Sequence, residues 1–122
     1  MEKKFCSYKE IKSLNFQYFD VSKVNIILGM FSACNSLTSL DLSTFKTSQV
    51  TNMRLMFYAC FSLKHLYISN FDTSKVTNMD RFFSLCYSLI SLDLSHFLTN
   101  NVEIMSSFFE SNSLLTSLQL SN

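Results

Sequence analysis

A repeat of 26 residues runs through the whole chain and decides what it can fold into. When the sequence is written in rows of 26, its apolar residues fall into columns without any insertion or deletion. A single unit of this length cannot bury its own apolar face, so repeats with such a period stack on one another. We therefore expect one repeat domain over residues 1–122. The most regular columns contain Leu40, Leu66, Leu92 and Leu118; Phe45, Phe71 and Phe97; and Phe31, Phe57, Phe83 and Phe109.

Each row has two halves in which the apolar residues are spaced differently. The first half contains the pattern Leu37-x-x-Leu40-x-Leu42, whose alternation is typical of a short strand with one buried face. In the second half the apolar residues lie three or four apart, which is the spacing of one face of a short helix. Thr77 and Asp80 have the spacing of a helix capping box. The second-half pattern consists of Val50, Met53, Met56, Phe57 and Cys60.

These two patterns predict an α/β fold, a leucine-rich-repeat solenoid of about 4–5 units with one short parallel strand and one short helix in each repeat. The repeats are expected at 11–36, 37–62, 63–88 and 89–114. Residues 1–10 would form a partial N-terminal unit or cap, and residues 115–122 would begin a further repeat. The last strand would then have an open edge, which favours pairing with another chain or segment.

The composition excludes several classes of function. The formal net charge is +1, so there is no basic excess to neutralise phosphates, and we do not expect a nucleic-acid binder. No run of 18 apolar residues occurs, which argues against membrane insertion. The first ten residues lack the apolar stretch of a secretory signal. On this ground alone the location could be intracellular.

The repeat also resembles a known family. Residues 72–79 read Asp-Thr-Ser-Lys-Val-Thr-Asn-Met, the pair Phe82-Phe83 follows, and residues 88–95 read Ser-Leu-Ile-Ser-Leu-Asp-Leu-Ser. This pattern resembles the bacterial-surface-antigen-A-like (BspA-like) leucine-rich repeats, in the 26-residue form found in mycoplasma-type surface lipoproteins. The resemblance implies display at the cell surface or secretion, adhesion, and binding of a protein or glycan partner. It implies neither catalysis nor a cofactor.

The candidate binding site is the exposed face of the predicted strands. Side chains between the buried leucines point away from the core, and most of them carry hydroxyl groups. Tyr67 would stand between Asp41 and Asp93 on the neighbouring strands, as an aromatic anchor beside two acceptors. The alternative is an ordinary solvated sheet face. The candidate residues are Ser39, Asp41, Ser43, His65, Tyr67, Ser69, Ser91, Asp93 and Ser95, and the same positions in the first row are Ser13, Asn15 and Gln17.

No pattern in the sequence points to an active site or a metal centre. Cys34, Cys60 and Cys86 share a column without metal-binding spacing, so we expect buried, reduced thiols, with disulfides as the alternative. His65 would lie on the opposite side of the core from these cysteines, which excludes a Cys–His nucleophile. Asp41 and Asp93 would be two strands, or about 10 Å, apart, which is too far for a glycosidase pair. We expect no metal site and no enzyme.

Two further columns hold polar residues. Thr47, Thr73 and Thr99 share one column, and Asn52 and Asn78 share another. In stacked repeats such residues are expected to satisfy backbone groups in turns.

Two hypotheses about function follow. The first is a non-catalytic binding or adhesion module that uses the strand face. The alternative is a structural or self-assembling repeat segment, either an intracellular scaffold or part of a longer array, that associates through its open C-terminal edge.

Overall fold

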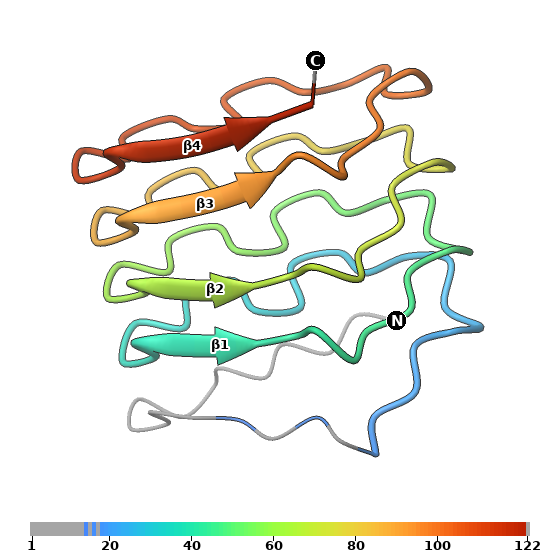
Figure 1. The fold of residues 1–122 in the computed structure, drawn as a ribbon, viewed down its shortest axis with the longest axis horizontal. Coiled ribbons are helices and arrows are strands. Elements are labelled where there is room, and N and C mark those ends of the chain that lie inside the picture. Colours follow the sequence, from blue (N-terminus) through green and yellow to red (C-terminus); the bar gives the residue numbers. More distant parts are fainter. Residues whose placement is uncertain (1–13, 15, 17, 122) are drawn as a thin grey trace.

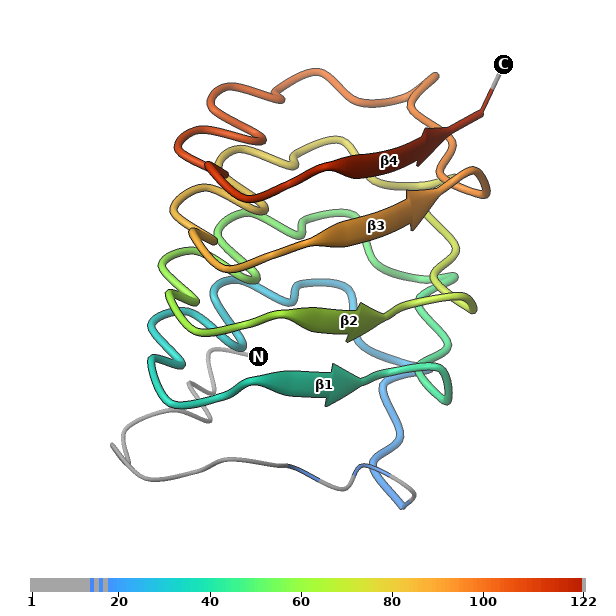
Figure 2. The same cartoon turned by 60° about the vertical axis from the view of Figure 1, so that its left-hand side comes forward.

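The computed structural model of the chain describes Leu14, Phe16 and residues 18–121. The chain winds through successive 26-residue layers, here called coils, and four short strands lie side by side on one face (Figures 1 and 2). The proposed cap at 1–10 and the positions Ser13, Asn15 and Gln17 lie outside the described residues. The strands are β1 (Ser39–Asp41), β2 (His65–Tyr67), β3 (Ser91–Leu94) and β4 (Ser117–Leu120).

Residues that pair between neighbouring strands are separated by one repeat length in the sequence. β1 pairs with β2 in parallel, and β3 pairs with β4 in parallel, so the four strands form two small sheets. Ser39 lies opposite His65, and Ser91 lies opposite Ser117, so each pair is one repeat apart. On another side of the coils, a line of parallel bridges with the same spacing joins Ile26, Asn52, Asn78 and Ile104.

The prediction of a helix in each repeat is wrong, and with it the prediction of an α/β leucine-rich-repeat solenoid. The described residues contain short strands and turns and no helix. In the segment expected to be helical, the Met56 N–H donates to the Met53 carbonyl at 3.2 Å, and the Cys60 N–H donates to the Phe57 carbonyl at 3.3 Å. These are bonds between residues three apart, so the segment is a run of tight turns.

The N–H groups that an α-helix would need point instead to the next coil. The Leu55 N–H donates to the Asp80 carbonyl at 2.9 Å, and the Phe57 N–H donates to the Phe82 carbonyl at 3.0 Å. Met53 and Ala59 donate to the next coil in the same way. The backbone of this segment is therefore satisfied between repeats and not within one.

Left-handed backbone conformations explain how turns imitate helical spacing. Two columns of the repeat have positive φ, at the third residue of each turn. The first and fourth residues of these turns point inward, as Met53, Met56, Phe57 and Cys60 do, so the apolar residues again fall three or four apart. Gly29, the only glycine in the chain, occupies the first of these columns. The columns are Gly29, Leu55, Arg81 and Ser107, and Ala33, Ala59, Leu85 and Ser111.

The capping box expected at Thr77 and Asp80 is also wrong, because there is no helix to cap. The Thr77 hydroxyl donates to the Thr51 carbonyl of the preceding coil at 3.3 Å. The Asp80 carboxylate accepts a hydrogen bond from Arg54, also one repeat earlier, at 3.0 Å. Both side chains therefore connect coils.

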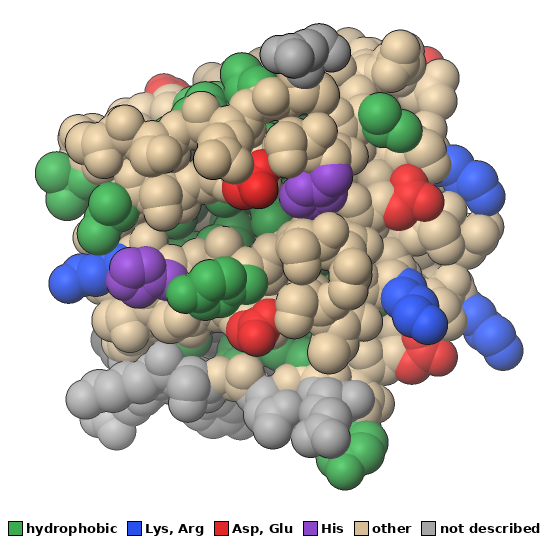
Figure 3. All heavy atoms as spheres, viewed as in Figure 1, with side chains coloured by type: hydrophobic (Ala, Val, Ile, Leu, Met, Phe, Trp, Pro, Cys, Tyr) green, Lys and Arg blue, Asp and Glu red, His purple; other side chains and the backbone are tan. Residues whose placement is uncertain are grey.

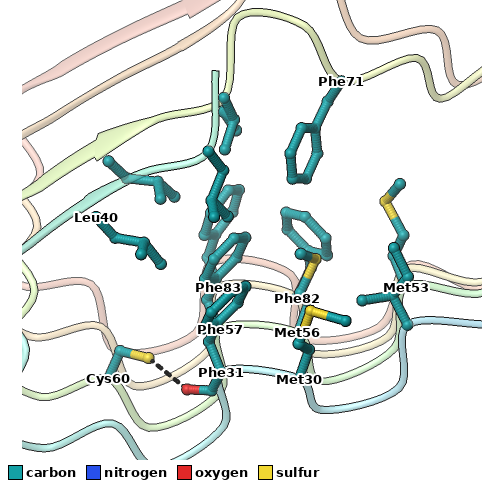
Figure 4. Close-up of a cluster of buried hydrophobic side chains, with 14 of the residues drawn as sticks. Met30, Phe31, Leu40, Met53, Met56, Phe57, Cys60, Phe71, Phe82 and Phe83 are labelled. Atoms are coloured by element: carbon teal, nitrogen blue, oxygen red, sulfur yellow. Dashed lines mark hydrogen bonds between the residues drawn. The ribbon is translucent and has the colours of Figure 1, made fainter. Parts of the chain in front are cut away.

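The core consists of aromatic and aliphatic side chains stacked in columns (Figure 4). The ring centroids of Phe31 and Phe57 are 5.7 Å apart, those of Phe57 and Phe83 are 5.6 Å apart, and those of Phe83 and Phe109 are 5.7 Å apart. The ring planes in these pairs lie within 8° of parallel. This separation is within the range of favourable offset stacking. The stacked rings and the hydrogen bonds between coils therefore repeat at the same interval, once in each 26-residue coil.

The threonine column behaves as expected at Thr47 and Thr73, which are both buried. The Thr73 hydroxyl donates to the Leu98 carbonyl at 2.9 Å and accepts from the Leu98 N–H at 2.8 Å. Thr47 makes the same two bonds with Asp72. Each hydroxyl thus replaces a peptide group between two coils. Thr99 is exposed, and no such pair exists for it within the described residues.

We predict that Ser107→Gly stabilises the protein by about 0.5–1 kcal/mol. A non-glycine residue in the left-handed region costs roughly 1–2 kcal/mol, and glycine recovers this cost minus its own loss of chain entropy. Ser107 is exposed and has φ 52°, so no packing is lost. The free energy of unfolding in urea measures the effect. The neighbouring Ser106→Gly is the matched control, because Ser106 is exposed and its φ is not positive, and it should be destabilising.

We predict that Thr73→Val destabilises the protein by about 1–3 kcal/mol, because valine has nearly the same shape but leaves the Leu98 N–H and carbonyl without partners. Thr73→Ser keeps both bonds and loses one methyl group, so it should cost only about 1 kcal/mol. Equal losses of unfolding free energy in the two variants would show that the hydroxyl does not connect the coils.

Candidate binding face

The structure places the predicted candidate residues on one surface, here called the strand face. Leu40, Leu66 and Leu92 point inward and are buried, while the residues between them point outward. Figure 3 shows this face, which is mainly polar and uncharged, with a few acidic and histidine side chains. Ser43 is partly buried and the other eight are exposed: Ser39, Asp41, His65, Tyr67, Ser69, Ser91, Asp93 and Ser95.

The two aspartates of this face have a structural role that the sequence analysis did not assign. The Asp41 carboxylate accepts a hydrogen bond from the Ser43 N–H at 2.9 Å, and the Asp93 carboxylate accepts one from the Ser95 N–H at 2.9 Å. Hydrogen bonds from the side chain and then the backbone of these serines lower the pKa of both carboxyl groups. Each aspartate therefore shapes the turn at the end of its strand, as in an Asx turn.

Tyr67 is the large aromatic residue of the strand face and is 55% exposed. It lies directly opposite Asp41 in the register of β1 and β2. On its other side a shallow hollow extends towards β4, and the side chains of Asp93 and Gln119 line it together with two serines. The hollow is lined by Leu66, Tyr67, Ser91, Leu92, Asp93, Ser117 and Gln119.

His65 lies on the same face, opposite Ser39 of β1, and is exposed. Among the described residues, no three His, Cys, Asp or Glu side chains are arranged to hold a metal ion, and the set Asp41, His65 and Asp93 is no exception. The described part of the chain also contains no helix with the length and apolar character needed to cross a bilayer.

The cysteine column faces the core on the turn side of each coil. Cys60 and Cys86 are free and buried, as expected. The Cys60 Sγ–H donates to the Phe31 carbonyl at 3.1 Å (Figure 4). Cys86 donates to the Phe57 carbonyl at the same distance. The hydrogen bond with Cys86, followed by burial, raises the pKa of the Cys60 thiol, which keeps it protonated and unreactive. Cys34 is disulfide-bonded, so the expectation of a reduced thiol is wrong there.

A charged cluster on the turn side was missed by the sequence analysis. The Asp80 carboxylate lies 3.0 Å from Arg54 Nε and 3.5 Å from Arg81 Nη1. Beside it, the Ser84 hydroxyl donates to the Glu110 carboxylate at 3.4 Å. The separation of Arg54 and Asp80 by one repeat was the signal that could have revealed the pair. Both arginines pair with the same carboxylate, so these charges are not free. Because Arg54 lies one repeat before Asp80, their ion pair connects two coils.

A pair of exposed rings forms another surface feature outside the predicted site. The rings of Phe61 and Tyr87 stack with centroids 5.3 Å apart, and both residues remain partly open to solvent. The pair sits one repeat apart, at the turns that lead into β2 and β3. Rings one repeat apart therefore stack at the surface of the coils as they do in the core.

We predict that acid destabilises the protein through the aspartates that close turns. Hydrogen bonds from Ser74 lower the folded-state pKa of Asp72 below its ordinary value of 3.8, as happens at Asp20, Asp41 and Asp93. This stabilisation is complete above the unfolded-state pKa and is lost as the pH falls through the folded-state pKa. The midpoint of thermal unfolding should therefore decrease as the pH falls below about 4.

Asp72→Asn provides the matched control for this prediction. The amide oxygen of asparagine can still accept the Ser74 N–H, but it does not titrate. The variant should lose less stability than the wild type between about pH 5 and pH 2. An identical pH dependence in both proteins would assign the acid sensitivity to other groups.

Comparison with known proteins agrees with the repeat. A family model described as "Mycoplasma protein of unknown function, DUF285" matches residues 1–121. No curated protein and no solved structure matches the chain. The match covers nearly the full length, and the chain therefore belongs to this family of repeat-containing mycoplasma proteins.

Proposed function

We propose that the chain is a non-catalytic binding module that contacts a protein or glycan partner through the strand face at a cell surface. The observation that carries this proposal is Tyr67, which is half exposed and lines a hollow of mixed polar and apolar character on the strand face. The finer resemblance to BspA-like surface repeats supports the surface location and the adhesive role.

The scaffold beneath the strand face favours binding because it is already ordered. Parallel strands hold their side chains at a spacing of about 4.8 Å, and the turns that follow β1 and β3 are fixed by Asp41 and Asp93. A preorganised surface loses little conformational entropy when a partner binds. A tyrosine on such a surface offers a large apolar ring and one hydroxyl with few rotatable bonds, so it suits the role of anchor.

The chemistry of the hollow suits a ligand rich in hydroxyl or amide groups. Gln119 offers both an amide donor and an acceptor, Ser91 and Ser117 offer hydroxyls, and Asp93 retains acceptor capacity beyond its bond to Ser95. No lysine or arginine lines the hollow, so a phosphate or sulfate group would find no counter-charge there. We therefore favour an uncharged glycan or a peptide over a polyanion.

We predict that Tyr67→Ser weakens partner binding by at least tenfold and leaves folding unchanged, since loss of an aromatic anchor typically costs about 2 kcal/mol or more. Biolayer interferometry against extracellular-matrix proteins and a panel of neutral glycans measures binding, and thermal unfolding checks the fold.

Tyr18→Ser is the matched control, because Tyr18 is 93% exposed and lies outside the strand face. The control should bind as the wild type does. Retained binding by Tyr67→Ser, equal loss in both variants, or a wild-type chain that binds nothing on either panel would contradict a ligand site on the strand face.

A further inference from the structure

The last coil exposes some residues whose columns are buried in the coils below. Met105 is 40% exposed, while its counterparts Met53 and Met79 are fully buried. Leu120 is 60% exposed, while Leu42 and Leu94 in the same column are almost fully buried. β4 accordingly lies at the end of the stack, with no described strand beyond it (Figures 1 and 2). The C-terminal face is thus an apolar surface with the composition of the core.

An apolar hollow opens on this C-terminal face. Its lining includes rings from three columns, those of Phe97, Phe108 and Phe109, and the exposed Met105 and Leu120 side chains. In the coils below, the next ring of the Phe109 column fills the equivalent space, with centroids 5.7 Å apart for Phe31 and Phe57 and 5.6 Å apart for Phe57 and Phe83, within the range of favourable stacking. The hollow is lined by Leu94, Phe97, Thr99, Met105, Phe108, Phe109, Leu120 and Ser121.

The same face carries a row of backbone donors without backbone acceptors. In the coil below, alternate N–H groups donate upward: Arg81 to the Ser106 carbonyl at 2.8 Å, and Phe83 to the Phe108 carbonyl at 3.0 Å. Met79 and Leu85 donate in the same way. The equivalent residues one repeat later have no such acceptor within the described part of the chain. They are Met105, Ser107, Phe109 and Ser111.

The open edge of β4 adds a further donor. The Leu42 N–H donates to the Tyr67 carbonyl of the next coil at 2.8 Å, and Leu120 occupies the same column in β4. Asn112 lies in the same end coil as the donor row. Its Oδ1 accepts the Cys86 N–H at 3.0 Å, while its buried Nδ2 has no partner in the described region.

We propose that this C-terminal face binds a polypeptide carrying the same 26-residue repeat, which adds one more parallel coil to the stack. The partner would place its strand beside β4, its carbonyl groups over the four donors from Met105 to Ser111, and an apolar side chain in the hollow. In strand addition, a peptide pairs with the open edge of a sheet. Here the partner would pair with the turn segment of the last coil as well as with β4. The inference does not depend on a ligand at the strand face.

The direction in which the N–H donors point favours a parallel coil over a second copy that packs with its own C-terminal face against this one. Each coil has N–H donors on its upper side and carbonyl acceptors on its lower side along the turn segment, as the Leu55 and Arg81 bonds show. Two C-terminal faces related by a twofold axis would place donors against donors, and buried donors without acceptors cost about 1–3 kcal/mol each. A coil added in the parallel sense brings acceptors to every donor.

The test uses the full chain and a synthetic peptide with the sequence of residues 78–94, extended by terminal lysines for solubility. In the structure this segment covers the coil below it: Asn78, Asp80, Phe82 and Ser84 supply carbonyls, and β3 supplies the strand. Amide hydrogen exchange followed by NMR should show rapid exchange at 105, 107, 109 and 111 in the free chain. Saturating peptide should slow these four amides at least tenfold.

Variants of the full chain test whether the peptide binds at the C-terminal face or at another surface. Leu120→Glu should weaken binding of the fluorescently labelled peptide at least tenfold, because a carboxylate would enter the apolar hollow. Ile90→Glu, at another exposed apolar position outside the hollow, should bind like the wild type, and so should Tyr67→Ser.

Three results would overturn the proposal. The first is equal protection of the four amides by a scrambled peptide of the same composition. The second is unchanged exchange of these amides in the presence of the authentic peptide, and the third is binding of that peptide to Leu120→Glu as tight as to the wild type. Protection of the same four amides that grows with protein concentration, without peptide, would support the proposal and identify the added coil as one from a second copy stacked in the same parallel sense.

Discussion

Hydrogen bonds between coils are the interaction on which the rest of this structure depends. Within one coil, the turn segment makes only short-range bonds, such as that from the Met56 N–H to the Met53 carbonyl. The alternate N–H groups bond to the next coil, and the side chains of Thr47 and Thr73 insert into the same network. No coil satisfies its own backbone, so each one is stable only through its neighbours.

The sequence predicted the period, the strands and the buried columns, but it could not distinguish a helix from a run of turns. Met53, Met56, Phe57 and Cys60 point inward in both cases, because consecutive turns and an α-helix both return every three or four residues. What separates them is backbone φ. Leu55 and Arg81 adopt left-handed conformations that the identity of neither residue suggests, and only the single Gly29 gave a local signal.

The candidate site was predictable to a similar degree. Alternation about Leu66 placed His65 and Tyr67 on the exposed face correctly, since side chains of a strand alternate between its two sides. The role of Asp41 was not predicted, although the repeated Asp-x-Ser pattern at Asp41, Asp72 and Asp93 marks turns in which the carboxylate accepts a backbone N–H. Spacing predicts which face a side chain occupies, but the local partner of a polar group depends on turn geometry.

The direction of the bonds between turn segments of neighbouring coils gives the stack a polarity that its side surfaces do not share. Donors on the upper side and acceptors on the lower side of the turn segments mean that the C-terminal face accepts a coil in one orientation only. The strand face runs along the stack, and its outward side chains take no part in these bonds. Binding at Tyr67 and addition of a coil beyond β4 therefore use different groups. One chain can carry a lateral ligand surface and an end surface for assembly without either compromising the other.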